Sequence, residues 1–346
     1  NQGNARIKTF DYLRPATVAE AVAAGAQPGA AYLSGGTNLT DLMKIGVAQP
    51  GLIVDVTRIP GLDRIEVLPD GAIRIGAMVR NADLARHKAI LSAAPALAEA
   101  VLSGASGQLR NMARVGGNFA QATRCSYFLD PLSACNRRDP GAGCAAIGGE
   151  TRGHAVLGWT DDCIAVHPSD MCVPLAAMDA VVEISGPDGD REDCVDSPAL
   201  AHGDLIPALR LPAGTAAFAP HARYLKLRER TSFAFALASC AAMLVIEDGV
   251  IKDARLALGG VAARPWRSQA AEASLIGAAP GPDAFRRAGE LALTGAKPSG
   301  DNGFKIELAI RIAARALARA AEGAPARIPA LPGSAFAPLH EGSAHV

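Results

Sequence analysis

The sequence of 346 residues predicts an α+β fold, in which short strands and helices alternate along the chain. Three segments support this prediction. Residues 304–321 have the spacing of a long amphipathic helix, residues 236–247 form an apolar run typical of a buried strand, and Pro69-Asp70-Gly71 separates two short apolar runs as in a β-hairpin. The length and the apolar fraction of 49% are enough for two or three domains.

The elements expected in the first half of the chain are short. Thr17 is a suitable N-cap for a helix that ends near Gly25. The other elements expected here are the strands Ala31–Leu33, Leu52–Val56, Ile65–Leu68 and Ala72–Ile75, the helix Leu39–Ile45, and a mostly helical segment, Asn81–Ala100, that Pro95 breaks. A long irregular loop, rich in glycine and proline, follows this helical segment.

The second half returns to a regular pattern at Pro174. Asp248-Gly249 is a turn between two apolar runs, so these runs are expected to pair. The elements expected here are the strands Ala180–Ile184, Tyr224–Arg228, Ala236–Glu247 and Val250–Leu258 and the helix Phe304–Ala321. The stretches near Pro212–Pro220 and after Ala324 have the composition of linkers.

The composition argues against several classes of protein. The 34 basic and 34 acidic residues balance, and only 4% of residues are aromatic, so neither nucleic acid nor a membrane surface is an expected partner. The longest apolar run, 233–246, is too short to span a bilayer. The first ten residues have no apolar export signal, which predicts a soluble chain without a signal of its own.

Two glycine turns have the chemistry of an anion site. Ser34-Gly35-Gly36-Thr37-Asn38 lies between an expected strand and an expected helix, and Val115-Gly116-Gly117-Asn118 repeats the paired glycines and the asparagine. Paired glycines let the backbone approach a ligand, and successive amides at a helix start favour a phosphate. A tight loop without a ligand is the alternative for either turn, but two such turns together indicate a dinucleotide.

Four of the seven cysteines are candidate ligands of one metal centre. Cys125, Cys135, Cys144 and Cys163 fall within 39 residues, with the spacing C-x9-C-x8-C-x18-C. Structural zinc sites usually contain a short C-x2-4-C pair, which is missing here, so the spacing favours an iron–sulfur cluster. Because His154 and His167 lie in the same region, a mixed zinc site stays open.

The remaining cysteines have weaker cases as ligands. Cys172 is a possible fifth ligand, although its apolar surroundings favour burial, and Cys240 is expected in the core. Cys194 has no partner in the sequence. No nucleophile–base motif or paired carboxylates occur, so redox chemistry in this chain would belong to its cofactors.

With these motifs assembled, the chain resembles the FAD-binding (medium) subunit of the xanthine dehydrogenase/aldehyde oxidoreductase family of molybdenum hydroxylases. The resemblance extends from about Phe10 to Ala321. Its motifs are Leu33-Ser34-Gly35-Gly36-Thr37-Asn38-Leu39, Ile75-Gly76-Ala77, the run from Leu109 to Asn118, Pro168-Ser169-Asp170 and the run from Tyr224 to Arg230.

The insert between Asn118 and Asp170 narrows the resemblance. Most such subunits lack it. Those that carry it resemble the bacterial periplasmic aldehyde oxidoreductase and 4-hydroxybenzoyl-CoA reductase, where the insert binds a [4Fe–4S] cluster. The runs from Cys135 to Ala146 and from His154 to Gly158 make the aldehyde oxidoreductase the closer of the two.

The resemblance implies a two-part α+β FAD-binding domain of the vanillyl-alcohol-oxidase type, followed by a C-terminal α+β domain. It implies that Asp170 contacts the ribityl region of the flavin, that Lys226 lies near the isoalloxazine, and that the four cysteines hold the cluster. The alternative for Lys226 is a solvated strand face. The implied FAD-binding positions are Leu33, Ser34, Gly35, Gly36, Thr37, Asn38, Leu39, Val115, Gly116, Gly117, Asn118, Asp170 and Lys226.

The same resemblance implies an electron-transfer subunit. Electrons from a molybdenum centre on a large partner subunit, carried through [2Fe–2S] centres on a small one, would reach FAD and leave to an external acceptor. An aldehyde is the expected substrate of the assembly. A subunit of a 4-hydroxybenzoyl-CoA reductase-like enzyme and a zinc-stabilised binding module without redox activity are the alternatives.

The expected domain limits are 1–220 for the FAD-binding domain, with 119–168 as the iron–sulfur insert, 221–330 for the C-terminal domain, and 331–346 for a tail. The sequence by itself favours the cytoplasm. Export of the folded complex on the signal of a partner would place it in the periplasm.

Overall fold

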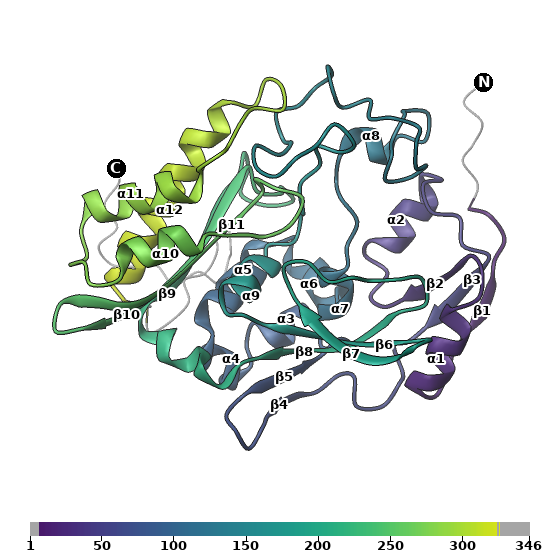
Figure 1. Ribbon diagram of the computed structural model, residues 1–346. Coiled ribbons are helices and arrows are strands. Elements are labelled where there is room, and N and C mark those ends of the chain that lie inside the picture. The colour runs from purple at the N-terminus through teal and green to yellow at the C-terminus, as the bar shows by residue number, and fades with distance from the viewer. Residues whose placement is uncertain (1–6, 324, 326–346) are drawn as a thin grey trace.

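The structure, a computed structural model, describes residues 7–323 and residue 325. The mixture of helices and sheets confirms the α+β class (Figure 1). The strands are β1 (Asp11–Leu13), β2 (Ala30–Leu33), β3 (Leu52–Asp55), β4 (Ile65–Val67), β5 (Ile73–Gly76), β6 (Val181–Gly186), β7 (Gly189–Cys194), β8 (Leu205–Leu211), β9 (Ala222–Leu227), β10 (Ala238–Glu247), β11 (Val250–Gly259) and β12 (Trp266–Arg267).

Most helices lie before the insert or near the C-terminal end of the described chain, whereas α8 lies within the insert and α9 directly follows it. None of the described helices combines the length and the apolar character needed to cross a membrane. The helices are α1 (Val18–Gly25), α2 (Leu39–Lys44), α3 (Asn81–Leu84), α4 (Lys88–Ala93), α5 (Pro95–Ser103), α6 (Gly107–Met112), α7 (Val115–Phe119), α8 (Ser126–Leu129), α9 (Cys172–Ala177), α10 (Gln269–Leu275), α11 (Pro282–Ala292) and α12 (Phe304–Ala321), and a 3₁₀ helix spans Ala213–His221.

A small parallel sheet, in the order β1-β3-β2, forms the first part of the chain. The side-chain oxygen of Thr17 accepts a hydrogen bond from the amide of Glu20 at 3.2 Å, which confirms the predicted N-cap of α1. Leu33, the last residue of β2, pairs with Asp55 of β3. The first glycine turn therefore begins at the carboxyl end of this sheet, and α2 starts directly after it.

A five-stranded antiparallel sheet, in the order β4-β5-β8-β6-β7, forms the second part. The predicted hairpin is confirmed, since Ile65 pairs with Ile75. Strand β7 was not predicted, because it is a mostly exposed edge strand whose residues are largely charged or polar. Strand β8 was also missed, and Pro207 obscures it although the strand lies at the centre of the sheet.

The helical segment 81–100 differs from its prediction. It is divided into α3, α4 and the start of α5, and Pro95 is the first residue of α5. Proline is favoured at this position because the first amides of a helix have no partner within the helix. Pro95 therefore begins a helix where the sequence suggested an interruption.

A four-stranded antiparallel sheet, in the order β12-β11-β10-β9, forms the last part. Helices α10, α11 and α12 cover one face of it (Figure 1). The prediction of a linker at 212–220 was wrong, because residues 213–221 form the 3₁₀ helix and bury Thr215 and Phe218. The segment has no apolar periodicity that would have indicated this. The predicted tail, 331–346, lies outside the described residues.

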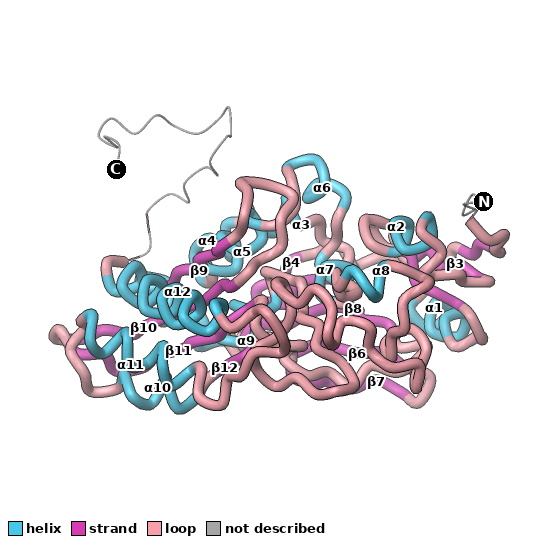
Figure 2. Tube along the Cα trace, turned by 90° about the horizontal axis from the view of Figure 1, so that it is seen from above, coloured by secondary structure: helices cyan, strands magenta, loops and turns pink. Residues whose placement is uncertain are grey.

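The insert, 119–168, is a long irregular loop as predicted (Figure 2). It contains the short helix α8. Its residues Val156 and Leu157 are buried in the same core as α12 and the inner face of β10 and β11. The insert thus packs on the C-terminal sheet, although it follows the FAD-binding motifs in sequence.

Candidate functional site

The two glycine turns lie against each other. Gly36 has a φ of 74°, which favours glycine. A Cβ on Gly35 would lie 2.1 Å from the carbonyl oxygen of Met112, and one on Gly117 would lie 3.4 Å from the Ser34 hydroxyl. The first turn is therefore packed on the backbone that leads into α7, where the second turn lies.

Two buried polar atoms of the first turn lack partners among the described residues. Among the described residues, the Ser34 hydroxyl and the Asn38 side-chain nitrogen are buried and have no hydrogen-bond partner. The Asn38 side-chain oxygen accepts from the amide of Ala122 at 3.0 Å, which fixes the side chain. Buried polar groups are normally hydrogen-bonded, so these donors fit an anionic ligand.

A cavity of about 250 Å³ lies beside the turns. Six of the predicted cofactor positions line it: Thr37, Asn38, Gly117, Asn118, Asp170 and Lys226. The other seven belong to the turns or the elements that carry them and do not line this cavity. These are Leu33, Ser34, Gly35, Gly36, Leu39, Val115 and Gly116.

Lys226 is buried and paired with Asp170. Its side chain is 3% exposed, and its Nζ lies 2.7 Å from Asp170 Oδ2. Nζ also donates to the carbonyl of Ser103 at 3.4 Å, at the end of α5 where a cation is favoured by the helix dipole. The alternative of a solvated strand face is therefore wrong.

Tyr224 completes this group from the same strand. Its hydroxyl donates to Asp170 Oδ1 at 2.6 Å. Burial, together with the charge of Asp170 and the hydrogen bond to it, raises the pKa of Tyr224 well above its usual value, so the hydroxyl keeps its proton. Asp170 is thus held from two sides by β9.

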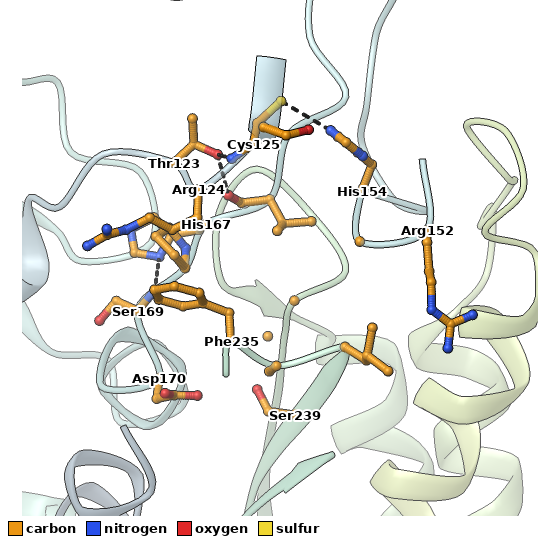
Figure 3. A pocket seen from close by; sticks show the side chains of 18 of the residues that line it. Thr123, Arg124, Cys125, Arg152, His154, His167, Ser169, Asp170, Phe235 and Ser239 are labelled. Atoms are coloured by element: carbon orange, nitrogen blue, oxygen red, sulfur yellow. Dashed lines mark hydrogen bonds between the residues drawn. The ribbon is translucent and has the colours of Figure 1, made fainter. Parts of the chain in front are cut away.

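A second cavity, of about 330 Å³, continues from the first. The two cavities share Arg124, Pro168, Asp170 and Phe235. In Figure 3, Cys125 and His154 lie at one end of this cavity and Asp170 at the other, with Phe235 between them. Both volumes are close to the range of ligand pockets, about 300–1,000 Å³. Together they form a cleft that joins the turns to the cysteine loop.

Arg124 is a residue of this cleft that sequence reasoning missed. Its guanidinium lies over the ring of Phe235, 5.2 Å from the centroid, and its Nε is buried without a partner among the described residues. Burial lowers its pKa, but an arginine stays charged at neutral pH. Its position directly before Cys125 is the one sequence feature that could have indicated it. No motif sets it apart from the 26 other arginines.

The four predicted metal-binding cysteines line one small cavity. Cys125, Cys135, Cys144 and Cys163 all contribute to it, and all four are free thiols. Cys135 and Cys144 pair as an isolated antiparallel bridge. Burial raises the pKa of the Cys125 thiol, and negative charge on Cys135 and Cys144 raises it further. The fold therefore gathers thiols that are far apart in sequence.

His154 lies beside this group. Its Nε2 is 3.2 Å from Cys125 Sγ, whereas its Nδ1 is buried and has no partner among the described residues. Among residues 7–323, no three His, Cys, Asp or Glu side chains converge as ligands of a single metal ion. Cys172 and Cys240 are buried outside the cavity, and Cys194 is exposed.

Arg114 and His167 have structural contacts. The guanidinium of Arg114 donates to the carbonyl of Met78 at 2.9 Å. His167 Nδ1 accepts from the amide of Ser169 at 3.3 Å, and burial, with the charge of Arg137, lowers the pKa of His167 to about 4. His167 is therefore neutral at pH 7.

Both main parts of the chain match known protein families. Residues 8–214 match the family described as the FAD binding domain in molybdopterin dehydrogenase, and residues 223–322 match the CO dehydrogenase flavoprotein C-terminal domain. Both parts of the chain thus match a flavoprotein oxidoreductase, which does not support the alternative of a zinc-stabilised binding module.

Relatives align over nearly the whole chain. The aldehyde oxidoreductase FAD-binding subunit PaoB of Escherichia coli (strain K12) is 44% identical, and the alignment covers 91% of this chain and 99% of that protein. The carbon monoxide dehydrogenase medium chain of Hydrogenophaga pseudoflava is 28% identical, with 89% and 96% covered.

Solved structures show the same fold. A chain of carbon monoxide dehydrogenase from Hydrogenophaga pseudoflava superposes with a TM-score of 0.72 at 28% identity, and one of the reconstituted enzyme from Oligotropha carboxidovorans with 0.74 at 25%. Each covers 92% of this chain and 100% of the other. The chain therefore belongs to the family of FAD-binding medium subunits of molybdenum hydroxylases.

Proposed function

We propose that this chain is the electron-transfer subunit of a molybdenum-dependent aldehyde oxidoreductase, with FAD in the cleft and a [4Fe–4S] cluster at the four cysteines. One observation supports this most directly. A single cavity is lined both by Cys125, from the cysteine group, and by Asp170, which also lines the cavity of the glycine turns. Two redox groups bound at these sites would be neighbours.

The residues of the first cavity fit FAD. The unpaired donors of Ser34 and Asn38 suit the phosphates. The paired glycines suit them as well, because a side chain on Gly117 would occupy the space beside Ser34. Asp170 and Lys226, at the other end, suit the ribityl and isoalloxazine parts. When bound, FAD and the cluster would supply the electron-transfer chemistry that side chains lack.

The cysteine group fits a cluster better than a single ion. Its four thiols surround one cavity without converging on one point. An iron–sulfur cluster is held by four cysteine thiolates that approach it from different directions, whereas a zinc ion draws its four ligands into one tetrahedron. His154 lies close enough to hydrogen-bond one of the sulfurs.

The residues of this chain would bind and orient the two groups. The Lys226–Asp170 pair and Tyr224 lie where the two cavities join, and Phe235 lies between Asp170 and the cysteine end (Figure 3). The partners proposed are a large subunit with the molybdenum cofactor and a small [2Fe–2S] subunit. An external acceptor would take the electrons. The aldehyde substrate follows from the similarity to an aldehyde oxidoreductase subunit.

Metal and flavin analysis of anaerobically purified protein tests this proposal. We expect FAD, and about four iron atoms and four acid-labile sulfides per chain, as a [4Fe–4S] site implies. Cys135→Ser should lose the iron and sulfide, whereas the control Cys194→Ser, at an exposed cysteine, should keep them. Stoichiometric zinc without labile sulfide would contradict the cluster, and absence of bound flavin would contradict the FAD site.

A further inference from the structure

Lys305 is a fully buried lysine near the start of α12. Its ammonium donates hydrogen bonds to the carbonyl oxygens of Gly153, His154 and Gly260, at 3.2, 2.8 and 2.6 Å. An ammonium has three N–H donors, so all of them are used. Because burying a charge costs free energy unless it is hydrogen-bonded, these contacts explain a lysine here, where packing alone would favour an apolar residue.

The segment around His154 is held by further contacts from the same side. The Asn302 side-chain nitrogen donates to the carbonyls of His154 and Ala155, at 3.0 and 3.1 Å, and the Ser299 hydroxyl donates to that of Ala155 at 2.8 Å. Asn302 is also fully buried. Backbone carbonyls 153–155 of the insert are thus bound by α12 and the loop before it.

This segment carries the imidazole that touches the cysteine group. His154 Nε2 lies 3.2 Å from Cys125 Sγ. A thiolate has no proton, so when Cys125 acts as a metal ligand the imidazole N–H must be the donor. The position of that donor depends on the backbone of His154, which Lys305 and Asn302 fix.

We propose that Lys305 is a positioning residue that fixes the backbone of Gly153 and His154, holds the His154 imidazole against Cys125, and so raises the reduction potential of the iron–sulfur cluster. This inference rests on the proposed cluster. Hydrogen bonds to the sulfurs and local net charge are among the factors that set such potentials. A hydrogen-bond donor to a cluster sulfur stabilises the more negative, reduced cluster.

The charge of Lys305 persists at neutral pH. Burial lowers the pKa of Lys305 to about 8, which is still above 7. Arg152 and Lys297, two other cations of this region, are exposed. Lys297 lies over the ring of Trp159 in the same insert, 4.4 Å from the centroid, and is therefore a matched control.

A redox titration of the cluster in the full-length flavoprotein tests the inference. Iron and sulfide are first measured in the wild type, whose lack of a cluster would overturn the proposed function. Lys305→Met should then lower the equilibrium constant for cluster reduction about tenfold, or about 59 mV for one electron. His154→Phe should lower it similarly, and Lys297→Met should leave it unchanged.

The double variant separates positioning from general damage. If Lys305 acts through His154, Lys305→Met should add little to the shift in a His154→Phe background. Hydrogen exchange of the 151–157 amides, which needs no cluster, should be faster in Lys305→Met than in Lys297→Met. An unchanged potential in Lys305→Met, fully additive shifts, or unchanged exchange would each overturn the inference.

Discussion

The Lys226 ammonium and the Asp170 carboxylate form an ion pair of 2.7 Å where the two cavities of the cleft join, and the Tyr224 hydroxyl donates to the same carboxylate. Both charged side chains are nearly buried, with 3% and 10% exposed. The pair has no net charge. Lys226 therefore does not act on a flavin as a lone cation, and its effect depends on Asp170.

Lys226→Met should destabilise the protein by about 3 kcal/mol, because it leaves the buried carboxylate of Asp170 unpaired. With that carboxylate uncompensated, the midpoint potential of bound FAD should fall by some tens of millivolts, since ~30 mV corresponds to ~1.4 kcal/mol for two electrons. Denaturant unfolding and a spectroelectrochemical titration measure the two effects. The double variant Lys226→Met/Asp170→Asn should recover part of the stability, and a double variant as unstable as the sum of the singles would contradict the pairing.

Arg124→Gln should lower the FAD midpoint potential without a matching loss of fold, because the guanidinium lies in the cleft with no acidic ion-pair partner among the described residues. A cation near a flavin favours its negatively charged reduced form. The expected shift is again some tens of millivolts. Arg124→Lys, which keeps the charge, is the control, and equal potentials in Gln and Lys variants would show that the charge has no influence.

Gly117→Val should yield protein that is poor in FAD but keeps its iron. An added Cβ would lie 3.4 Å from the Ser34 hydroxyl, and the valine side chain would narrow the cavity at the turn. Absorbance of released flavin per chain is the measurement. The control is Gly107→Val, at an exposed position of α6 where an added Cβ meets no atom within 4 Å. Normal FAD content in Gly117→Val would show that the second turn does not contribute to FAD binding.

Stability should rise with pH between about 8 and 10.5 through Lys305. The pKa of Lys305 is lowered by burial from 10.5 to about 8, so in this window the unfolded chain holds a proton that the folded chain has released. The free energy of unfolding therefore increases as the pH rises through this window. This gain in stability is lost as the pH falls through about 8. The lowered pKa corresponds to a gain in stability of at most about 3 kcal/mol. The three carbonyl acceptors reduce this gain, because they favour the charged form of Lys305.

Denaturant unfolding of wild type and Lys305→Met at pH 7 and pH 10 measures this effect. The wild type should gain stability relative to the variant at the higher pH, since only it contains the titrating amine. An identical pH dependence in both proteins would mean that Lys305 titrates as an exposed lysine does.

The sequence predicted well those elements whose own residues show their environment. The apolar run 236–247 became β10, and the amphipathic helix 304–321 was confirmed at both ends. The sequence analysis missed the polar edge strand β7 and the central strand β8, which contains Pro207. Their own residues do not have a strand pattern, and they form strands because they pair with neighbouring strands.

For the site, motifs gave the glycine turns and the cysteines but not their surroundings. The contacts of Arg124 and Lys305 join segments that meet only in the folded chain. Arg124 lies over the ring of Phe235, and Lys305 binds the carbonyls of residues 153 and 154. A single arginine or lysine carries no local pattern that reports such a partner. The domain limits at 220 and 330 stay predictions.

The contact between Lys305 and the His154 carbonyl also constrains the order of folding, because its partners are 151 residues apart in the chain. Synthesis proceeds from the N-terminus, so the insert leaves the ribosome long before α12 exists. Closing so long a loop also costs entropy that the earlier segments cannot offset alone. We therefore expect the four thiols to reach their final arrangement only after the last helix has been made, so that metal loading follows completion of the chain.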